Sequence, residues 1–149
     1  MIPHDFRHAR DIINSKGLLS DVDSIISELH HGWLQGHASV SFQKQILIKH
    51  KWATEHPIGI TDRRYAYDGF KDGLAFEIEW SVSEKILEII LKMQYGFVKG
   101  EVEAGLIVNI RSDSKNSPIL LEEAGGAKEI EEMKYIVTVP LYLVVFGKN

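Results

Sequence analysis

Cysteine is absent from this chain of 149 residues. Without cysteine there is no disulfide framework and no cysteine-ligated zinc site, and nothing ties the protein to an oxidising compartment. No apolar run approaches the length that crosses a membrane, and the first residues lack the apolar core of a signal peptide. We therefore expect a cytoplasmic protein with no membrane partner.

Positively charged residues are in the minority, with 17 Lys and Arg against 21 Asp and Glu and a formal net charge of −4. This balance argues against a surface covered with phosphate-binding lysines. It does not exclude DNA, because acids gathered around a metal count in the net charge while they face a cation. The basic residues Lys44, Lys49, Lys51, Arg63 and Arg64 form either a phosphate track or an ordinary solvated face.

Motifs for zinc and nucleotide chemistry are also missing. The seven histidines show no HExxH-like spacing, and the glycines follow no P-loop pattern. The length and the 44% hydrophobic content fit one globular domain covering residues 1–149. The acidic residues therefore remain as the candidates for a functional site.

Apolar residues at helical spacing predict four helices. Ser20 is expected to cap the first, which ends near Gly32, and residues 41–52 fit either a helix or a strand, of which we favour the helix. Ser81 or Ser83 would cap a third helix that ends at Gly96. Its buried side is expected to carry Ile86, Leu87, Ile90 and Met93. Residues 122–134 form the fourth.

Four further segments have the pattern of strands. Residues 64–71 and 74–80 alternate between apolar and polar, whereas 104–110 is almost continuously apolar, which is typical of a strand buried on both faces. Residues 139–146 form a last strand with Pro140 near its start, and 57–61 is loop-like or edge-like. A helix between two strands indicates a right-handed crossover. The expected fold class is α/β, with a mixed central sheet flanked by helices.

The dipeptide Asp72-Gly73 lies between the two alternating segments. It is a strong signal for a two-residue type I′ turn, because that turn needs a positive φ at both central residues. The turn sets the pairing: Lys71 faces Leu74, and further along the ladder Asp68 faces Glu77.

Alternation then places Glu79 on the same face as Asp68 and Glu77. The opposite, apolar face is expected to hold Tyr65, Tyr67, Leu74, Phe76, Ile78 and Trp80. Two carboxylates ~5 Å apart repel by about 3 kcal/mol at an effective dielectric near 20, and a divalent cation would reverse the sign. The pattern predicts either a metal-binding patch of three acids or a solvated polar strand face.

The hairpin and the helix and strand after it resemble a known nuclease core. The run Asp68-Gly-Phe-Lys-Asp-Gly-Leu-Ala-Phe-Glu77-Ile-Glu79-Trp80 is similar to that of the PD-(D/E)XK superfamily. The closest resemblance is to the BamHI/BglII-like type II restriction endonucleases, whose members place an Asp, a Glu and then Glu or Gln instead of Lys. Residues 91–108 resemble that family's helix, turn and buried strand, and 137–147 its closing strand. The resemblance extends from about Trp52 onward.

The resemblance implies a Mg²⁺-dependent DNA endonuclease of restriction or genome-defence type. Mn²⁺ is the other metal that would suit the site. Asp68 and Glu77 would hold the metal, and Glu79, where the commonest form of the superfamily has lysine, would be a second ligand or a general base. Glu28 and Glu55 are candidates for an assisting upstream acid. Double-stranded DNA would be the substrate, and a homodimer would cut both strands.

Two other classes of protein remain open at the level of sequence. One is a non-catalytic DNA-binding or protein-interaction module that retains the nuclease fold, and the other is a small α/β ligand-binding protein.

Overall fold

A computed structural model describes residues 1–37, 39–59, 65–79, 84–110 and 126–147. Its strands are β1 (Ile2–Phe6), β2 (Ala53–Pro57), β3 (Ala66–Lys71), β4 (Leu74–Glu79), β5 (Ala104–Ile110) and β6 (Leu141–Phe146). Its helices are α1 (Ala9–Ser15), α2 (Leu19–Leu34), α3 (Val40–Lys49), α4 (Glu84–Val98) and α6 (Ala127–Glu132).

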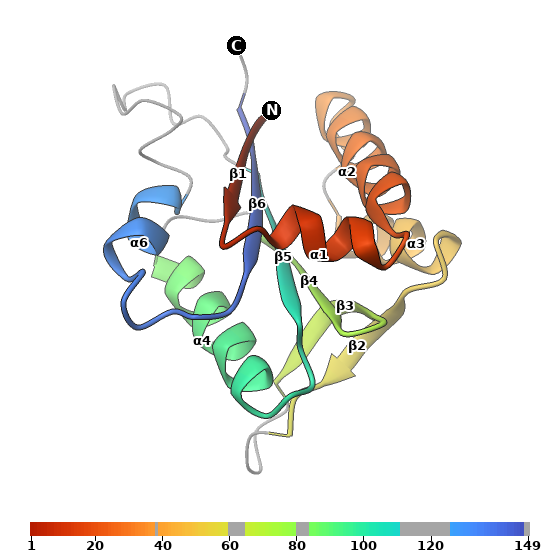
Figure 1. Cartoon of the computed structure of the whole chain (residues 1–149). Helices are drawn as coiled ribbons and strands as arrows, with labels where there is room; N and C mark the ends of the chain where they lie inside the picture. Colours follow the sequence, from red (N-terminus) through yellow and green to blue (C-terminus); the bar gives the residue numbers. More distant parts are fainter. Residues whose placement is uncertain (38, 60–64, 80–83, 111–125, 148–149) are drawn as a thin grey trace.

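The strands form one mixed sheet in the order β1-β6-β5-β4-β3-β2. Strands β4, β5 and β6 are parallel, and the remaining pairs are antiparallel. Figure 1 shows α4 and α6 on one side of the sheet and α1, α2 and α3 on the other. The predicted α/β class with a mixed central sheet flanked by helices is confirmed. None of the helices described is long and apolar enough to span a membrane.

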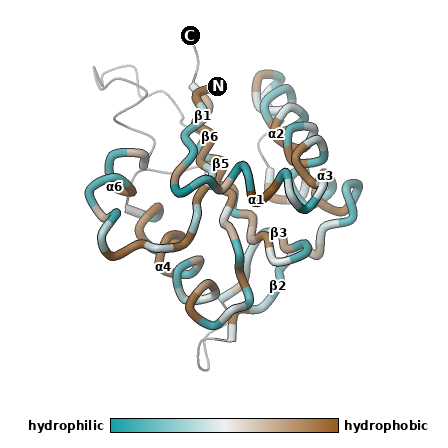
Figure 2. Tube along the Cα trace, in the orientation of Figure 1, coloured by the Kyte–Doolittle hydropathy of each residue, from teal (hydrophilic) through white to brown (hydrophobic). Residues whose placement is uncertain are grey.

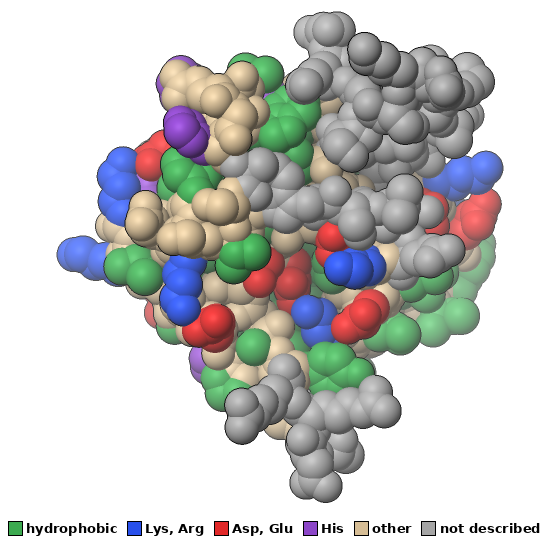
Figure 3. Space-filling model, turned by 180° about the vertical axis from the view of Figure 1, so that it is seen from behind, with side chains coloured by type: hydrophobic (Ala, Val, Ile, Leu, Met, Phe, Trp, Pro, Cys, Tyr) green, Lys and Arg blue, Asp and Glu red, His purple; other side chains and the backbone are tan. Residues whose placement is uncertain are grey.

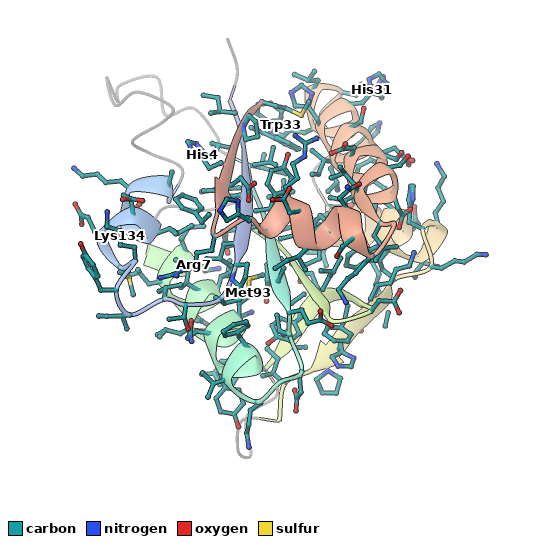
Figure 4. All side chains as sticks on the ribbon, viewed as in Figure 1. His4, Arg7, His31, Trp33, Met93 and Lys134 are labelled. Carbon is teal, nitrogen blue, oxygen red and sulfur yellow. The ribbon has the colours of Figure 1, made fainter. Side chains whose placement is uncertain are left out.

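Two hydrophobic clusters lie on the two faces of the sheet. One joins the sheet to α1, α2 and α3, and the other joins it to α4 and α6. All residues of β5 and β6 are buried, which explains why these two strands are apolar along almost their whole length (Figure 2). Met93 of α4 lies against β5, where the backbone of Gly105 leaves space for its sulfur (Figure 4).

The helix between residues 41 and 52 is confirmed as α3, and the hydroxyl of Ser39 caps it by accepting the Phe42 N–H at 3.2 Å. The proposed cap of α2 was wrong. Ser20 lies inside the first turn, because the helix already begins at Leu19 after the tight turn at Gly17, whose φ is +69°. The carbonyl of Leu18, not a side chain at Ser20, accepts the first helical N–H, from Val22.

Gly96 does not end α4, which continues to Val98 before a turn at Gly100 with φ +76°. It is glycine because a Cβ there would lie 2.4 Å from the Tyr67 hydroxyl and 2.6 Å from Val102. Leu87, expected on the buried side of this helix, is 39% exposed. The proposed caps Ser81 and Ser83 and the strand residue Trp80 lie outside the described residues.

The C-terminal part of the chain agrees with the expected order of elements. Helix α6 falls within the predicted range 122–134, of which 122–125 lies outside the described residues, and β6 begins directly after Pro140. The guanidinium of Arg7 donates to the carbonyl oxygens of Lys134 at 2.6 Å and Val137 at 3.2 Å. These bonds tie the start of α1 to the segment after α6 (Figure 4).

Candidate active site

The hairpin between β3 and β4 has the predicted turn and the predicted register near the turn. Asp72 and Gly73 have φ values of 48° and 79°. Lys71 pairs with Leu74, Phe70 with Ala75 and Gly69 with Phe76. A short local signal thus fixes the geometry of the strands that carry the acids.

The ladder between β3 and β4 ends at Gly69, one residue short of Asp68. The Ile78 N–H, which would otherwise continue the ladder, donates to Asp68 Oδ2 at 2.8 Å. The pairing of β2 with β3 is also interrupted at Asp68, opposite Glu55, whose φ of 54° is unusual for a residue with a side chain. Asp68 therefore lies where the pairing of β3 with both neighbouring strands is interrupted, opposite a residue with a strained backbone.

Because of this interruption, one prediction about the two faces of the hairpin was wrong. Leu74, Phe76 and Ile78 pack together on the side of α1, α2 and α3, as expected. Tyr67 and Tyr65 instead pack on the side of α4, where the Tyr67 hydroxyl donates to the carbonyl of Lys92 at 3.0 Å. Strict alternation fails here because it holds only along an unbroken ladder.

Asp68 and Glu77 meet even though they are not paired in the ladder. Each side chain affects the pKa of the other, and Glu77 is only 4% exposed. Burial, together with the charge of Asp68, raises the pKa of Glu77 from 4.5 to about 8, although Lys92 opposes the shift. Burial also raises the pKa of Asp68, against the hydrogen bond from Ile78. Without a cation, the surroundings of Glu77 therefore favour its protonated form near neutral pH.

Glu79, the third predicted residue, is half-buried at the end of β4. Burial is the main cause of the raised pKa of Asp68, and the negative charge of Glu79 adds to it. The two acids are therefore close enough to repel each other. Within the described ranges, no group of three or more His, Cys, Asp or Glu side chains is placed to hold a metal ion. The structure thus pairs Asp68 with Glu77, and the charge of Glu79 reaches Asp68.

Sequence reasoning missed Lys92, a residue of α4. Its Nζ lies 2.5 Å from Glu77 Oε1, and its side chain is only 14% exposed. The available signal was its position three residues after Ile89 and one before Met93, both buried on the sheet side of the helix. A lysine beside such a stripe is often an ordinary snorkelling residue, so the pattern alone could not identify its partner.

The two candidate upstream acids differ in their distance from this site. Glu55 lines a cavity of about 60 Å³ together with Asp68, and its carboxylate contacts Lys44 Nζ at 2.7 Å. Glu28 belongs to a separate polar network, where it contacts Lys49 and the ring of His50, both at 2.9 Å. Of the two, only Glu55 lies beside Asp68.

The residues of the predicted basic cluster make separate contacts. Lys44 and Lys49 are each paired with an acid, and Lys51 is exposed. Arg63 and Arg64 lie outside the described residues. Figure 3 shows acidic and basic side chains side by side near the middle of the face opposite to that of Figure 1. The described cations therefore form a mixed surface and not a continuous basic track.

Comparison with known proteins gives a likeness in structure alone. No family model matches the chain, and neither does any curated protein sequence. A crystal structure of the restriction endonuclease BglII complexed with a DNA 16-mer matches with a TM-score of 0.73 and 16% identity, covering 99% of this chain and 76% of that one. Free BglII matches with a TM-score of 0.61 and 16% identity, covering 99% and 79%. The chain has the restriction-endonuclease fold, as the resemblance of residues 68–80 predicted.

Proposed function

We propose that this chain, which has the fold of the restriction endonuclease BglII, is a Mg²⁺-dependent endonuclease of restriction or genome-defence type. Its proposed substrate is double-stranded DNA, and its proposed compartment is the cytoplasm. The observation that carries the proposal is the pair formed by the buried Glu77 and the partly buried Asp68, whose pKa values are both raised, where the pairing of β3 with β4 ends. An acid buried beside a second acid carries an electrostatic cost, which a divalent cation bound between the two would relieve.

Asp68 and Glu77 are the proposed metal ligands. Magnesium is usually held by only one or two carboxylates, with water and substrate phosphate as its other ligands, so the pair is sufficient. Each acid also has a neighbouring donor that fixes its orientation, Ile78 for Asp68 and Lys92 for Glu77. When bound, the metal would polarise the scissile phosphate and lower the pKa of an attacking water.

Glu79 is proposed as a second ligand or as the general base. It stands two residues after Glu77 on the same strand, and its charge reaches Asp68. Glu55 is the better of the two assisting acids, because it lines the small cavity beside Asp68.

Cleavage of supercoiled plasmid in the presence of Mg²⁺ or Mn²⁺ tests the proposal. Wild-type protein is expected to nick or linearise the plasmid, and EDTA should stop the reaction. Asp68→Ala and Glu77→Ala should lower the rate by at least about a hundredfold while the circular dichroism spectrum stays unchanged. Glu88→Ala, an exposed acid of α4, is the matched control and should cut like wild type. Cleavage by Glu77→Ala at the wild-type rate would exclude the assigned role.

We also propose a homodimer, because one site cuts one strand and a two-fold dimer presents two sites to a duplex. Helix α4 carries an apolar stripe suited to such a contact: Leu87 is 39% exposed, Leu91 59% and Val98 74%. Light scattering should give a dimeric mass for wild type and a monomeric mass for Leu91→Glu. Ile48→Glu, at a residue of α3 that is 56% exposed, is the control and should remain dimeric. A monomeric wild-type mass with DNA bound would contradict the proposal.

A non-catalytic DNA-binding or protein-interaction module is the second candidate. It is favoured by the finding that no three-residue metal-binding group occurs in the described part of the chain. Wild-type protein that shifts duplex DNA in a gel but leaves it uncut with either metal would support this candidate over the nuclease.

A further inference from the structure

Lys92 is a lysine on the sheet side of α4, where a charged side chain needs a partner. Only 14% of its side chain is exposed, whereas Lys85 of the same helix is exposed. Burial of an ammonium group is costly unless an acid and further acceptors compensate for the lost water. Lys92 finds both: its Nζ lies 2.5 Å from Glu77 Oε1 and donates to the Ala66 carbonyl at 3.4 Å.

The backbone of Lys92 is held as firmly as its side chain. Its carbonyl accepts the hydroxyl of Tyr67 at 3.0 Å, and Tyr67 is 1% exposed. Contacts from β3 thus fix the residue at both ends, through Tyr67 on one side and Ala66 on the other. The amine is directed at Glu77 by the packing of α4 on the sheet, and it cannot turn to solvent without leaving these contacts.

Each of the two acids of the site is held by one donor. Lys92 contacts Oε1 of Glu77, and the Ile78 N–H contacts Oδ2 of Asp68. One oxygen of each carboxylate is therefore fixed by a donor of the fold. Donors placed in this way behind metal ligands orient the ligands and determine the affinity of the site.

We propose that Lys92 is a positioning residue of this site, which orients the carboxylate of Glu77 for a divalent cation. This inference rests on the proposed nuclease function.

The test compares Lys92→Met, which keeps the length but removes the charge, with Lys92→Arg, which keeps the charge. Lys85→Met is the control from the exposed side of the same helix. For each protein, the Mg²⁺ concentration that gives half of the maximal rise in melting temperature is measured without DNA. The Mg²⁺ dependence of plasmid cleavage is measured in parallel, and melting in EDTA verifies that each variant folds.

Lys92→Met is expected to need at least about ten times more Mg²⁺ in both measurements, with cleavage recovering towards the wild-type rate at saturating metal. Lys92→Arg should restore most of the affinity, and Lys85→Met should equal wild type. Unchanged or tighter metal binding by Lys92→Met would overturn the inference. So would a cleavage rate that stays low at saturating metal, because Lys92 would then act on the substrate. If wild type neither responds to Mg²⁺ nor cuts DNA, the proposed function itself fails.

Discussion

Replacing Glu77 by Gln should remove a pH-dependent loss of stability from the metal-free protein. The pKa of Glu77 is raised from 4.5 to about 8 by burial and by the charge of Asp68. Between these values the unfolded chain releases a proton that the folded chain retains. The contribution of Glu77 to stability is therefore highest below pH 4.5, falls as the pH rises, and levels off above pH 8.

The size of the effect depends on the width of this pH window. Each pH unit within it costs about 1.4 kcal/mol, so from pH 5 to pH 7.5 Glu77 should lower the free energy of unfolding by about 3 kcal/mol. For a chain of this length, this corresponds to roughly 6–12 °C in melting temperature. Glutamine has nearly the shape of the protonated side chain beside Lys92, and it does not titrate. The slope, and not the absolute stability, is the diagnostic quantity.

Differential scanning fluorimetry in EDTA from pH 5 to pH 7.5 measures this slope. The melting temperature of wild type should fall by roughly 6–12 °C relative to that of Glu77→Gln, whereas Glu88→Gln should behave like wild type. Addition of Mg²⁺ at pH 7.5 should raise the melting temperature of wild type and have much less effect on Glu77→Gln. Parallel pH profiles for wild type and Glu77→Gln, or equal responses to Mg²⁺, would refute the reasoning.

Two predictions concern stability away from the site. Gly105→Ala should destabilise the protein by about 1–3 kcal/mol in urea unfolding, because a Cβ would lie 2.2 Å from the sulfur of Met93, whereas Gly59→Ala, with open space around it, should be nearly neutral. Burial lowers the pKa of the His50 ring, but hydrogen bonds to two carboxylates, one of them that of Asp21, outweigh burial and raise the pKa. Its contribution to stability should be present below about pH 6.5 and lost as the pH rises through the raised value, so His50→Gln should cost more at pH 6 than at pH 9. An equal cost at both pH values would mean that the ring is not charged in the folded protein.

The features that the sequence by itself determined are local or periodic ones. Asp72-Gly73 fixed the hairpin and the first three pairs of its ladder, because few other dipeptides adopt two successive positive φ angles. The unbroken apolar run 104–110 identified a central strand, since only a strand covered on both faces loses the alternation of polar residues. The restriction-endonuclease fold was predicted from the resemblance of the run 68–80 and of the segments after it to a known nuclease core, and not from the order of the elements alone.

Only the tertiary structure decided how the acids are arranged. The sequence placed Asp68 opposite Glu77 on a regular ladder, but the ladder breaks at Asp68, which moves Tyr67 to the face of α4. The partner of Glu77 is Lys92, from a helix that comes after β4 in sequence and packs on the sheet. No periodicity specifies such a contact, because it depends on how α4 lies across the sheet and on which side chains this packing excludes from water.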